Sequence, residues 1–172
     1  LSSSEAWTRW EDLPESADTY VSELVFFEDR TLVHLGEGPM SRLWKWTEQW
    51  GWELFQGWPP EGDTLWGVDV HNDTLLLGGC CGVTIYDSNE NLIPTNNSPG
   101  NWMLVRDVAF DKSGDIWIAS RIGGLIRYVY NTEGSLANGI FAPQGPPTAD
   151  VRKIDCWNSN LWFATGGVDA AW

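Results

Sequence analysis

The sequence predicts an all-β fold made of several similar sheets, each with about four antiparallel strands. Three observations support this prediction. Short runs of β-forming residues lie between polar turns, one strand pattern recurs along the chain, and no long stretch carries apolar residues at helical spacing. The pattern is clearest between Val105 and Tyr128.

That segment contains three strands in succession. Val105–Phe110 is rich in β-forming residues, and the polar residues Asp111–Gly114 predict a hairpin turn. Ile116–Ser120 is a second apolar strand, and two glycines precede a third strand at Leu125–Tyr128. One such unit buries too little apolar surface to be stable alone. The chain is therefore expected to repeat it.

The repeat is visible when the chain is aligned on the middle strand, Asp115–Ser120. Thr74–Gly79 and Asn160–Thr165 match this strand, and Thr31–Gly36 matches it more loosely. The preceding strands share one aligned position, which holds Leu24, Val68, Val108 and Ile154. These residues are 44, 40 and 46 positions apart (68 − 24, 108 − 68 and 154 − 108). A period of about 40–50 residues with several strands per unit is typical of β-propeller blades.

One aligned position of the middle strands is expected to form a layer between neighbouring blades. It holds Val33, Leu76, Trp117 and Trp162. Stacked sheets bury one another's faces, which an isolated four-stranded sheet cannot do.

The third unit resembles the repeat of two-component-regulator propellers, whose blades carry a D-x-x-G-x-hydrophobic-W-hydrophobic-G/A-T…GG-L core. The matching residues run from Asp111 through Trp117 to Gly123-Gly124-Leu125. The fourth unit matches in its middle (Asn160–Gly167), whereas the first two keep little beyond apolar strands and glycines. The resemblance implies a β-propeller in a bacterial periplasmic or surface setting, within a sensor ectodomain or secretion machinery.

The chain is expected to form one propeller domain of about four blades. The predicted blades span about 15–58, 59–94, 95–143 and 144–172, and a strand at 5–14 completes the last one. If the ends meet, these blades close a complete small ring. An arc of a larger ring is the favoured alternative, and two chains assembled into one larger ring is the third.

Composition excludes some partners. The net charge of −14 (10 basic and 24 acidic residues) argues against nucleic acid and anionic membranes, which require a basic surface. The longest uncharged apolar run, 75–83, is too short to span a bilayer. Cys80, Cys81 and Cys156 show no disulfide or metal spacing, so they are expected to be free buried thiols.

No catalytic motif, cofactor motif or metal-binding motif appears. His34 and His71 are expected to be hydrogen-bonded structural residues. The segment Asp111–Asp115 lacks the spacing and terminal glutamate of a calcium loop, which again favours a turn.

Polar residues of the predicted innermost strands are candidates for the central channel. They are Glu23, Asp69, Asp107, Lys153 and Asp155. They are expected to be solvated channel residues. Paired carboxylates at such a place could also serve glycoside hydrolysis or lyase chemistry.

A binding surface is expected on the rim formed by the loops that connect outer to inner strands and second to third strands. The candidate residues there are Glu37, Trp58, Trp102, Arg121 and Asp169. Tryptophans on a rim would suit stacking on sugars or anchoring a protein partner.

The sequence therefore predicts a non-enzymatic, extracytoplasmic β-propeller for recognition or scaffolding, without cofactor or membrane insertion. A protein or a polysaccharide is the expected partner, and assembly into a larger complex is possible. Two alternatives stay open: a lectin-like propeller that uses rim tryptophans, and a polysaccharide lyase or glycosidase that uses acidic channel residues.

Overall fold

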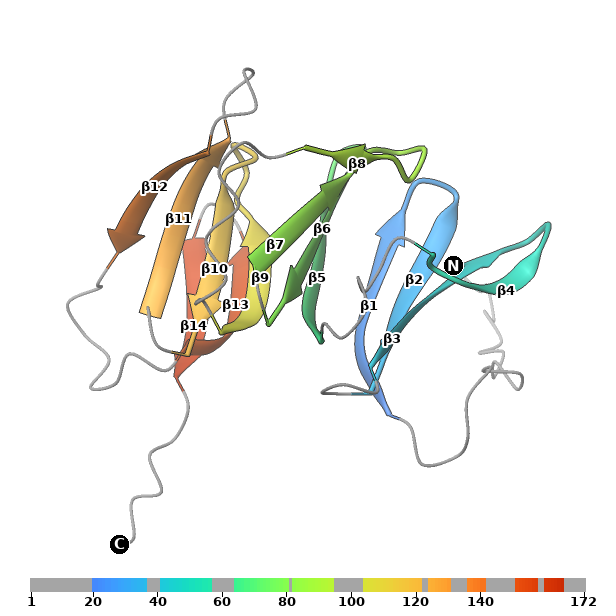
Figure 1. Cartoon of the computed structure of the whole chain (residues 1–172), viewed down its shortest axis with the longest axis horizontal. Coiled ribbons are helices and arrows are strands. Elements are labelled where there is room, and N and C mark those ends of the chain that lie inside the picture. The colour runs from blue at the N-terminus through green and yellow to red at the C-terminus, as the bar shows by residue number, and fades with distance from the viewer. Residues whose placement is uncertain are drawn as a thin grey trace, which may run out of the picture.

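The computed structural model describes residues 20–36, 41–56, 64–80, 82–94, 104–121, 124–130, 136–141, 151–157 and 160–165. All regular secondary structure in these residues is β-strand, arranged in four antiparallel sheets (Figure 1). This confirms the predicted all-β class.

The first three sheets are meanders of four strands, each paired with the next along the chain. Sheet 1 contains β1 (Val21–Phe27), β2 (Arg30–Leu35), β3 (Arg42–Thr47) and β4 (Gly51–Leu54). Sheet 2 contains β5 (Leu65–His71), β6 (Thr74–Gly79), β7 (Gly82–Tyr86) and β8 (Leu92–Ile93). Sheet 3 contains β9 (Val105–Phe110), β10 (Ile116–Ser120), β11 (Gly124–Tyr130) and β12 (Leu136–Phe141). Sheet 4 contains β13 (Val151–Trp157) and β14 (Asn160–Thr165).

The sheets stand face to face in an arc, with the first strand of each on the inside (Figure 1). Strand β1 contacts β5, β5 contacts β9, and β9 contacts β13. This is the blade arrangement of a partial propeller. The strand expected at 5–14 lies outside the described residues, so its place in the last blade stays a prediction.

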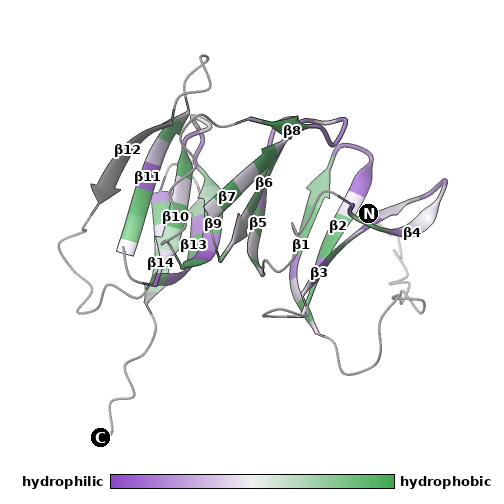
Figure 2. Ribbon diagram, viewed as in Figure 1, coloured by the Kyte–Doolittle hydropathy of each residue, from purple (hydrophilic) through white to green (hydrophobic). Residues whose placement is uncertain are grey.

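The first two strands of sheets 1, 2 and 3 are joined by hairpin turns. In sheets 1 and 2 the turns have two residues, and Glu28 and Asn72 adopt left-handed φ angles of 55° and 51°. In sheet 3 the Asp111 carboxylate accepts hydrogen bonds from the backbone N–H groups of Ser113 and Asp115 at 2.8 and 3.1 Å. The segment is therefore the predicted hairpin turn. In Figure 2 hydrophilic colours gather on turns between strands, for example the turn between β7 and β8.

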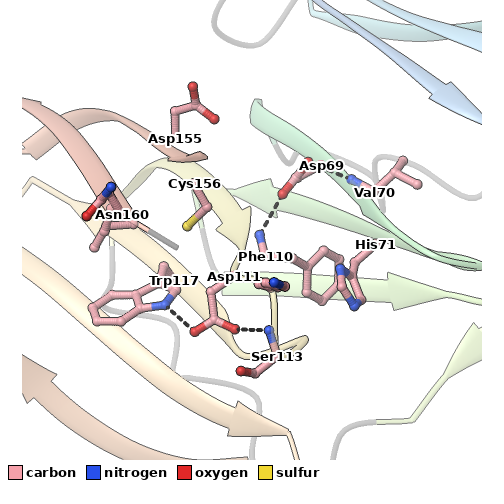
Figure 3. Close-up of a pocket in the computed structure, with 12 residues that line it drawn as sticks. Asp69, Val70, His71, Phe110, Asp111, Ser113, Trp117, Asp155, Cys156 and Asn160 are labelled. Atoms are coloured by element: carbon pink, nitrogen blue, oxygen red, sulfur yellow. Dashed lines mark hydrogen bonds between the residues drawn. The ribbon is translucent and has the colours of Figure 1, made fainter. Parts of the chain in front are cut away.

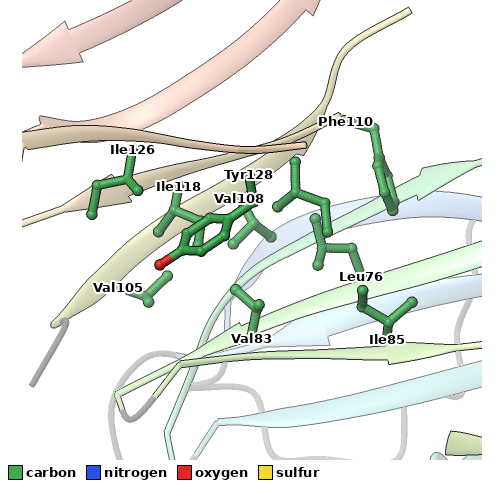
Figure 4. Close-up of a cluster of buried hydrophobic side chains, with 10 residues drawn as sticks. Leu76, Val83, Ile85, Val105, Val108, Phe110, Ile118, Ile126 and Tyr128 are labelled. Atoms are coloured by element: carbon green, nitrogen blue, oxygen red, sulfur yellow. The ribbon is translucent and has the colours of Figure 1, made fainter. Parts of the chain in front are cut away.

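Each boundary between sheets holds one cluster of buried apolar side chains. Between sheets 1 and 2 these are Phe27, Leu32, Leu43, Phe55, Leu65, Val68, Leu75, Leu77 and Tyr86. Between sheets 2 and 3 they are Leu76, Val83, Ile85, Val105, Val108, Phe110, Ile116, Ile118, Ile126 and Tyr128 (Figure 4). Between sheets 3 and 4 they are Ala109, Ala119, Leu125, Val151 and Ile154.

The prediction of a between-blade layer is confirmed in part. Leu76 and Trp117 pack toward the sheet that follows them in the chain. Val33 faces the other way, because it pairs with the outward-facing Leu24, whereas its neighbour Leu32 lies in the cluster with sheet 2. The loose alignment of β2 was thus wrong by one residue, and such a slip exchanges the two faces of a strand. Trp162 has the matching orientation but is 60% exposed at the end of the arc.

Two paired glycines allow sheet 3 to approach sheet 2 closely. A Cβ at Gly67 would lie 2.6 Å from Asp107 Oδ1 and 2.8 Å from the backbone N of Val108. A Cβ at Gly78 would lie 2.6 Å from the Val108 side chain. A larger residue at either position would force β9 away from β5.

Candidate functional site

Carboxylates of the inner strands reach across to the next sheet in the arc. Glu23 Oε2 of β1 accepts a hydrogen bond from the Val68 N–H of β5 at 2.8 Å. Asp107 Oδ2 of β9 accepts one from the Ile154 N–H of β13 at 2.9 Å. An inner strand is the edge of its sheet, so alternate amides have no partner in the ladder. Two of the predicted channel residues therefore bond neighbouring blades together.

Asp69 makes the corresponding contact between sheets 2 and 3. Its Oδ2 accepts from the Phe110 N–H at 2.5 Å, and its Oδ1 accepts from the Val70 N–H at 2.8 Å. Burial raises the pKa of Asp69, although both hydrogen bonds oppose that change. Each of the three boundaries thus contains one carboxylate-to-amide bond near the axis.

Lys153 joins two of these carboxylates in an axial cluster. Its Nζ lies 3.5 Å from Asp107 Oδ1 and 3.9 Å from Glu23 Oε1, and its side chain is 54% exposed. Burial raises the pKa of Glu23 to about 7, and the nearby Asp107 charge adds to the effect. Burial also raises the pKa of Asp107 to about 6, against the attraction of Lys153.

His34 lies beside this cluster, paired with Glu23 in the sheet register, and only 1% of it is exposed. Neither of its ring nitrogens has a hydrogen-bond partner among the described residues. The expectation of a hydrogen-bonded histidine was therefore wrong at this position. Burial, together with the Lys153 charge, lowers the pKa of His34 to about 4, so the ring is neutral at neutral pH.

A cleft of about 710 Å³ opens at the ends of β5, β9 and β13 (Figure 3). We call it the channel-mouth cleft. Two predicted channel residues, Asp69 and Asp155, line it. The other lining residues are Val70, His71, Phe110, Asp111, Lys112, Ser113, Trp117, Cys156, Asn160 and Leu161.

One wall of the channel-mouth cleft is held rigidly by Asp111. Besides its two bonds to the turn, this carboxylate accepts a hydrogen bond from Trp117 Nε1 at 3.0 Å (Figure 3). The Arg127 guanidinium lies 5.6 Å from the centre of the Trp117 ring and pairs with Asp115. The indole is thus fixed from both sides.

The opposite wall is more open. Asp155 and Asn160 are exposed, and His71 contacts Phe110 with ring centres 5.6 Å apart. Cys156 is a free, half-buried thiol whose pKa burial raises to about 11, with Asp111 adding to the effect. A thiol with so high a pKa is a poor nucleophile at neutral pH. The cleft therefore offers polar and aromatic contacts rather than a reactive cysteine.

A second cleft of about 750 Å³ lies at the turns of sheets 1 and 2, and we call it the outer cleft. Glu90 accepts hydrogen bonds there from Arg30 Nη1 at 2.6 Å and from Lys45 Nζ at 2.8 Å. Trp50, at the tip of the β3–β4 turn, is 68% exposed beside this ionic group. The other lining residues are Asp29, Trp46, Thr47, Glu48, Gln49, Glu53 and Asn89.

The rim predicted from the sequence is the one opposite to these clefts. Arg121 is exposed there, and its backbone N–H donates to the Leu104 carbonyl at 2.9 Å. The other candidates on that rim, Glu37, Trp58, Trp102 and Asp169, lie outside the described residues and stay predictions. Sequence reasoning treated the tight hairpin turns as structural only. The run of polar residues from Asp111 to Asp115 beside Trp117 was the available signal.

In the part of the chain that the structure describes, no group of three or more His, Cys, Asp or Glu side chains is placed to hold a metal ion. Cys80 and Cys156 are half-buried thiols that form no disulfide, and Cys81 lies outside the described ranges. Within those same ranges, no helix has the length and apolar character needed to cross a bilayer.

Comparison with known proteins shows the fold alone. No family model and no curated protein sequence matches the chain. Among solved structures, a streptogramin B lyase aligns with a TM-score of 0.61 at 12% identity, covering 81% of this chain and 46% of the lyase. Virginiamycin B lyase from Staphylococcus aureus aligns with a TM-score of 0.59 at 16% identity, covering 88% and 50%.

The extracellular domain of a hybrid two-component system from B. thetaiotaomicron aligns with a TM-score of 0.47 at 15% identity, covering 89% of this chain and 26% of that one. The chain thus spans about half the length of the two lyases. The likeness to the two lyases supports a β-propeller fold for the four sheets.

Proposed function

We propose that the chain is a non-catalytic, extracytoplasmic β-propeller module that recognises a partner, as part of a sensor ectodomain or of a secretion or surface complex. The extracytoplasmic setting follows from the resemblance of the Asp111–Leu125 repeat to two-component-regulator propellers. The channel-mouth cleft is the proposed recognition site.

One observation carries this proposal. The inner-strand carboxylates Glu23, Asp69 and Asp107 each accept a hydrogen bond from a backbone N–H of the next sheet, so they link neighbouring blades. The channel-mouth cleft beside them is lined by Asn160 and His71, next to the fixed indole of Trp117. A rigid aromatic edge with a few convergent polar groups is typical of a binding site.

The proposal is tested by ligand screening of the whole chain. A glycan array and a set of peptides are screened, with intrinsic tryptophan fluorescence as the readout. We expect a ligand whose affinity falls at least tenfold in Asn160→Ala and in His71→Gln. Trp50→Ala, which alters only the outer cleft, serves as the matched control. Unchanged affinity in both cleft variants would reject the channel-mouth cleft as the site.

The same screen tests a lectin-like function at the outer cleft. An exposed tryptophan beside charged and amide side chains is a suitable platform for a sugar ring. Glycan binding that is lost in Trp50→Ala but kept in Asn160→Ala would assign carbohydrate recognition to the outer cleft.

A second candidate function is lyase or glycosidase chemistry in the axial cluster. The observation that favours it is the pair of raised pKa values, about 7 for Glu23 and about 6 for Asp107, next to Lys153. A carboxyl with a pKa near the working pH is suited to general acid–base catalysis. Activity on acidic or neutral polysaccharides that disappears in Glu23→Gln and in Asp107→Asn would support this function over recognition.

A further inference from the structure

Each of the four inner strands contains a β-bulge at the same place. The bulges lie near the beginning of β1, β5, β9 and β13, at the end of these strands opposite to the channel-mouth cleft. The residues that the sheet register skips are Ser22, Trp66, Arg106 and Arg152. They are 44, 40 and 46 positions apart (66 − 22, 106 − 66 and 152 − 106), so they share one position of the repeat.

The bulges of neighbouring sheets bring their side chains together. A bulge interrupts the ladder and re-aims a side chain. The guanidinium carbon of Arg106 lies 4.6 Å from the centre of the Trp66 ring in the preceding sheet. Arg152 holds the corresponding position in the following sheet, whose inner strand β13 contacts β9 (Figure 1). We call Trp66, Arg106 and Arg152 the bulge site.

Arg106 differs from two other arginines that lie over an aromatic ring. Arg30 also pairs with Glu90, and Arg127 also pairs with Asp115. Arg106 forms no hydrogen bond or ion pair with any described residue, and its Nε is buried without an acceptor. A buried donor without an acceptor costs free energy that a bound acceptor would recover. The charge of Arg106 is therefore available to a ligand.

The stacked arrangement of Arg106 suits the binding of a carboxylate. Stacking on an indole uses the flat face of a guanidinium and leaves the N–H donors at its edge. These donors form a fixed fork that matches the two oxygens of a carboxylate. Arg152 is exposed and supplies a second positive charge at the same position of the next sheet.

The rim around the bulge site is basic, although the chain as a whole has a net charge of −14. Arg121 is exposed beside the beginning of β9, where its backbone N–H donates to the Leu104 carbonyl. Arg42 is the first residue of β3 on the same rim. In the described ranges, no strand begins or ends on this rim with an aspartate or a glutamate. The rim therefore attracts anions locally.

Two carboxylates follow bulge residues directly in the chain, but neither pairs with Arg106. Glu23 and Asp107 each accept a hydrogen bond from a backbone N–H of the next sheet. Lys153 Nζ lies 3.9 Å from Glu23 Oε1 and 3.5 Å from Asp107 Oδ1. Their negative charges are thus compensated within the axial cluster.

We propose that the bulge site binds the carboxylate of a uronic acid in a short acidic oligosaccharide. Arg106 and Arg152 hold the carboxylate, and the half-buried indole of Trp66 lies beside the sugar ring. The indole favours a sugar over an acidic peptide, because an aromatic side chain offers an apolar surface to a pyranose. The negative charge of the whole chain favours a short ligand over a long polyanion.

The test measures uronate binding to the full chain by isothermal titration calorimetry. Trigalacturonate and triglucuronate are the probes, and their methyl esters are matched ligands that have the same rings without the charges. We expect at least one uronate to bind at least tenfold more tightly than its methyl ester. Its affinity should fall as the NaCl concentration rises, because the contact is ionic.

Four variants locate the contact. Arg106→Gln should lower the uronate affinity at least tenfold, and Arg106→Lys should also lower it, because an ammonium lacks the fork. Arg152→Gln alters an exposed side chain, so it should fold and lower the affinity about threefold. Lys112→Gln removes one positive charge at the opposite end of the inner strands and should leave the affinity unchanged.

Four results would overturn the inference. They are no binding of either uronate, equal affinity for a uronate and its methyl ester, unchanged affinity in both Arg106→Gln and Arg152→Gln, and tighter binding of an acidic peptide than of either uronate. The bulge site and the channel-mouth cleft lie at opposite ends of the inner strands. Asn160→Ala and His71→Gln should therefore leave uronate binding unchanged, so the two proposals fail independently.

Discussion

The boundary between sheets 2 and 3 differs from the boundary between sheets 3 and 4. The first is filled by branched aliphatic and aromatic side chains that are almost completely buried, and Gly67 and Gly78 bring the sheets close together. The second has a smaller buried cluster that includes two alanines, with Trp117, Cys156 and Leu161 only half-buried around it. The channel-mouth cleft opens where the packing is thinner.

The difference indicates how one repeat serves two purposes. Bulky side chains at a boundary provide stability, because each buried apolar group contributes about 1.5–3 kcal/mol. Where Ala109 and Ala119 replace them, the neighbouring side chains line a cleft instead. The hydrogen bond of Trp117 to Asp111 then keeps that cleft in shape.

Truncating one side chain at each boundary should show the difference directly. Ile118→Ala removes a fully buried side chain between sheets 2 and 3, and we expect a loss of about 2–5 kcal/mol in the free energy of unfolding. Leu161→Ala removes a half-buried side chain from the other boundary and should cost about 1 kcal/mol. Urea denaturation measures both, and equal losses would contradict the comparison.

The close approach of sheets 2 and 3 predicts a marked effect of one added methyl group. Gly67→Ala would place a Cβ within 3 Å of backbone atoms of Asp107 and Val108. Backbone atoms of a paired strand cannot move aside without shifting the strand. We expect a loss of about 1–3 kcal/mol in the free energy of unfolding. An unchanged or higher denaturation midpoint would show that the sheets are not in contact here.

The axial cluster predicts a pH dependence of stability. Because folding raises the pKa of Glu23 from 4.5 to about 7, the folded state holds a proton that the unfolded state releases. This contribution is complete below pH 4.5 and is lost as pH rises through 7, at about 1.4 kcal/mol per unit of pKa difference. The raised pKa of Asp107 likewise makes the free energy of unfolding fall as pH rises to about 6.

His34 acts in the opposite direction, since its lowered pKa makes stability fall as pH drops from 6.5 to about 4. A variant isolates the Glu23 contribution. Glu23→Gln should reduce the fall in stability between pH 5 and 8, measured by thermal or urea unfolding. Glu28→Gln, at an exposed glutamate, should leave the profile unchanged. The prediction fails if the two variants have the same profile.

The smallest predicted effect concerns the wall of the channel-mouth cleft. Trp117→Phe keeps most of the ring but removes the hydrogen bond from Nε1 to Asp111. We expect a loss of about 1 kcal/mol in stability. Affinity for any cleft ligand should fall with it, because the wall is less rigid. Weaker binding without loss of stability would mean that the indole touches the ligand directly.

Much of the fold could be predicted from the sequence, because repetition of a strand pattern is a strong signal. The boundaries of β9 and β10 agree with the prediction made from Val105–Ser120. The face assignment of Val33 failed, since the first repeat lacks the glycine and tryptophan markers that fix the alignment, and one residue exchanges the faces of a strand.

The candidate site was predicted less completely. The repeat alone could place Asp69, Asp107 and Lys153 on the inner strands β5, β9 and β13. The contacts of these residues with backbone amides of the next sheet could not, since they depend on how closely two sheets approach. The channel-mouth cleft was missed because its residues come from strand ends and one turn in three sheets, which are distant in sequence and meet only in the folded chain.

Hydrogen exchange at single amides tests the central claim, that inner-strand carboxylates join each blade to the next. The amides of Val68, Phe110 and Ile154 lie on sheet edges, yet each donates to a carboxylate of the preceding blade. We predict slow exchange at all three, and selective loss of protection at Phe110 in Asp69→Ala. Exchange of these amides as fast as that of the exposed turn residue Lys112 would contradict the account.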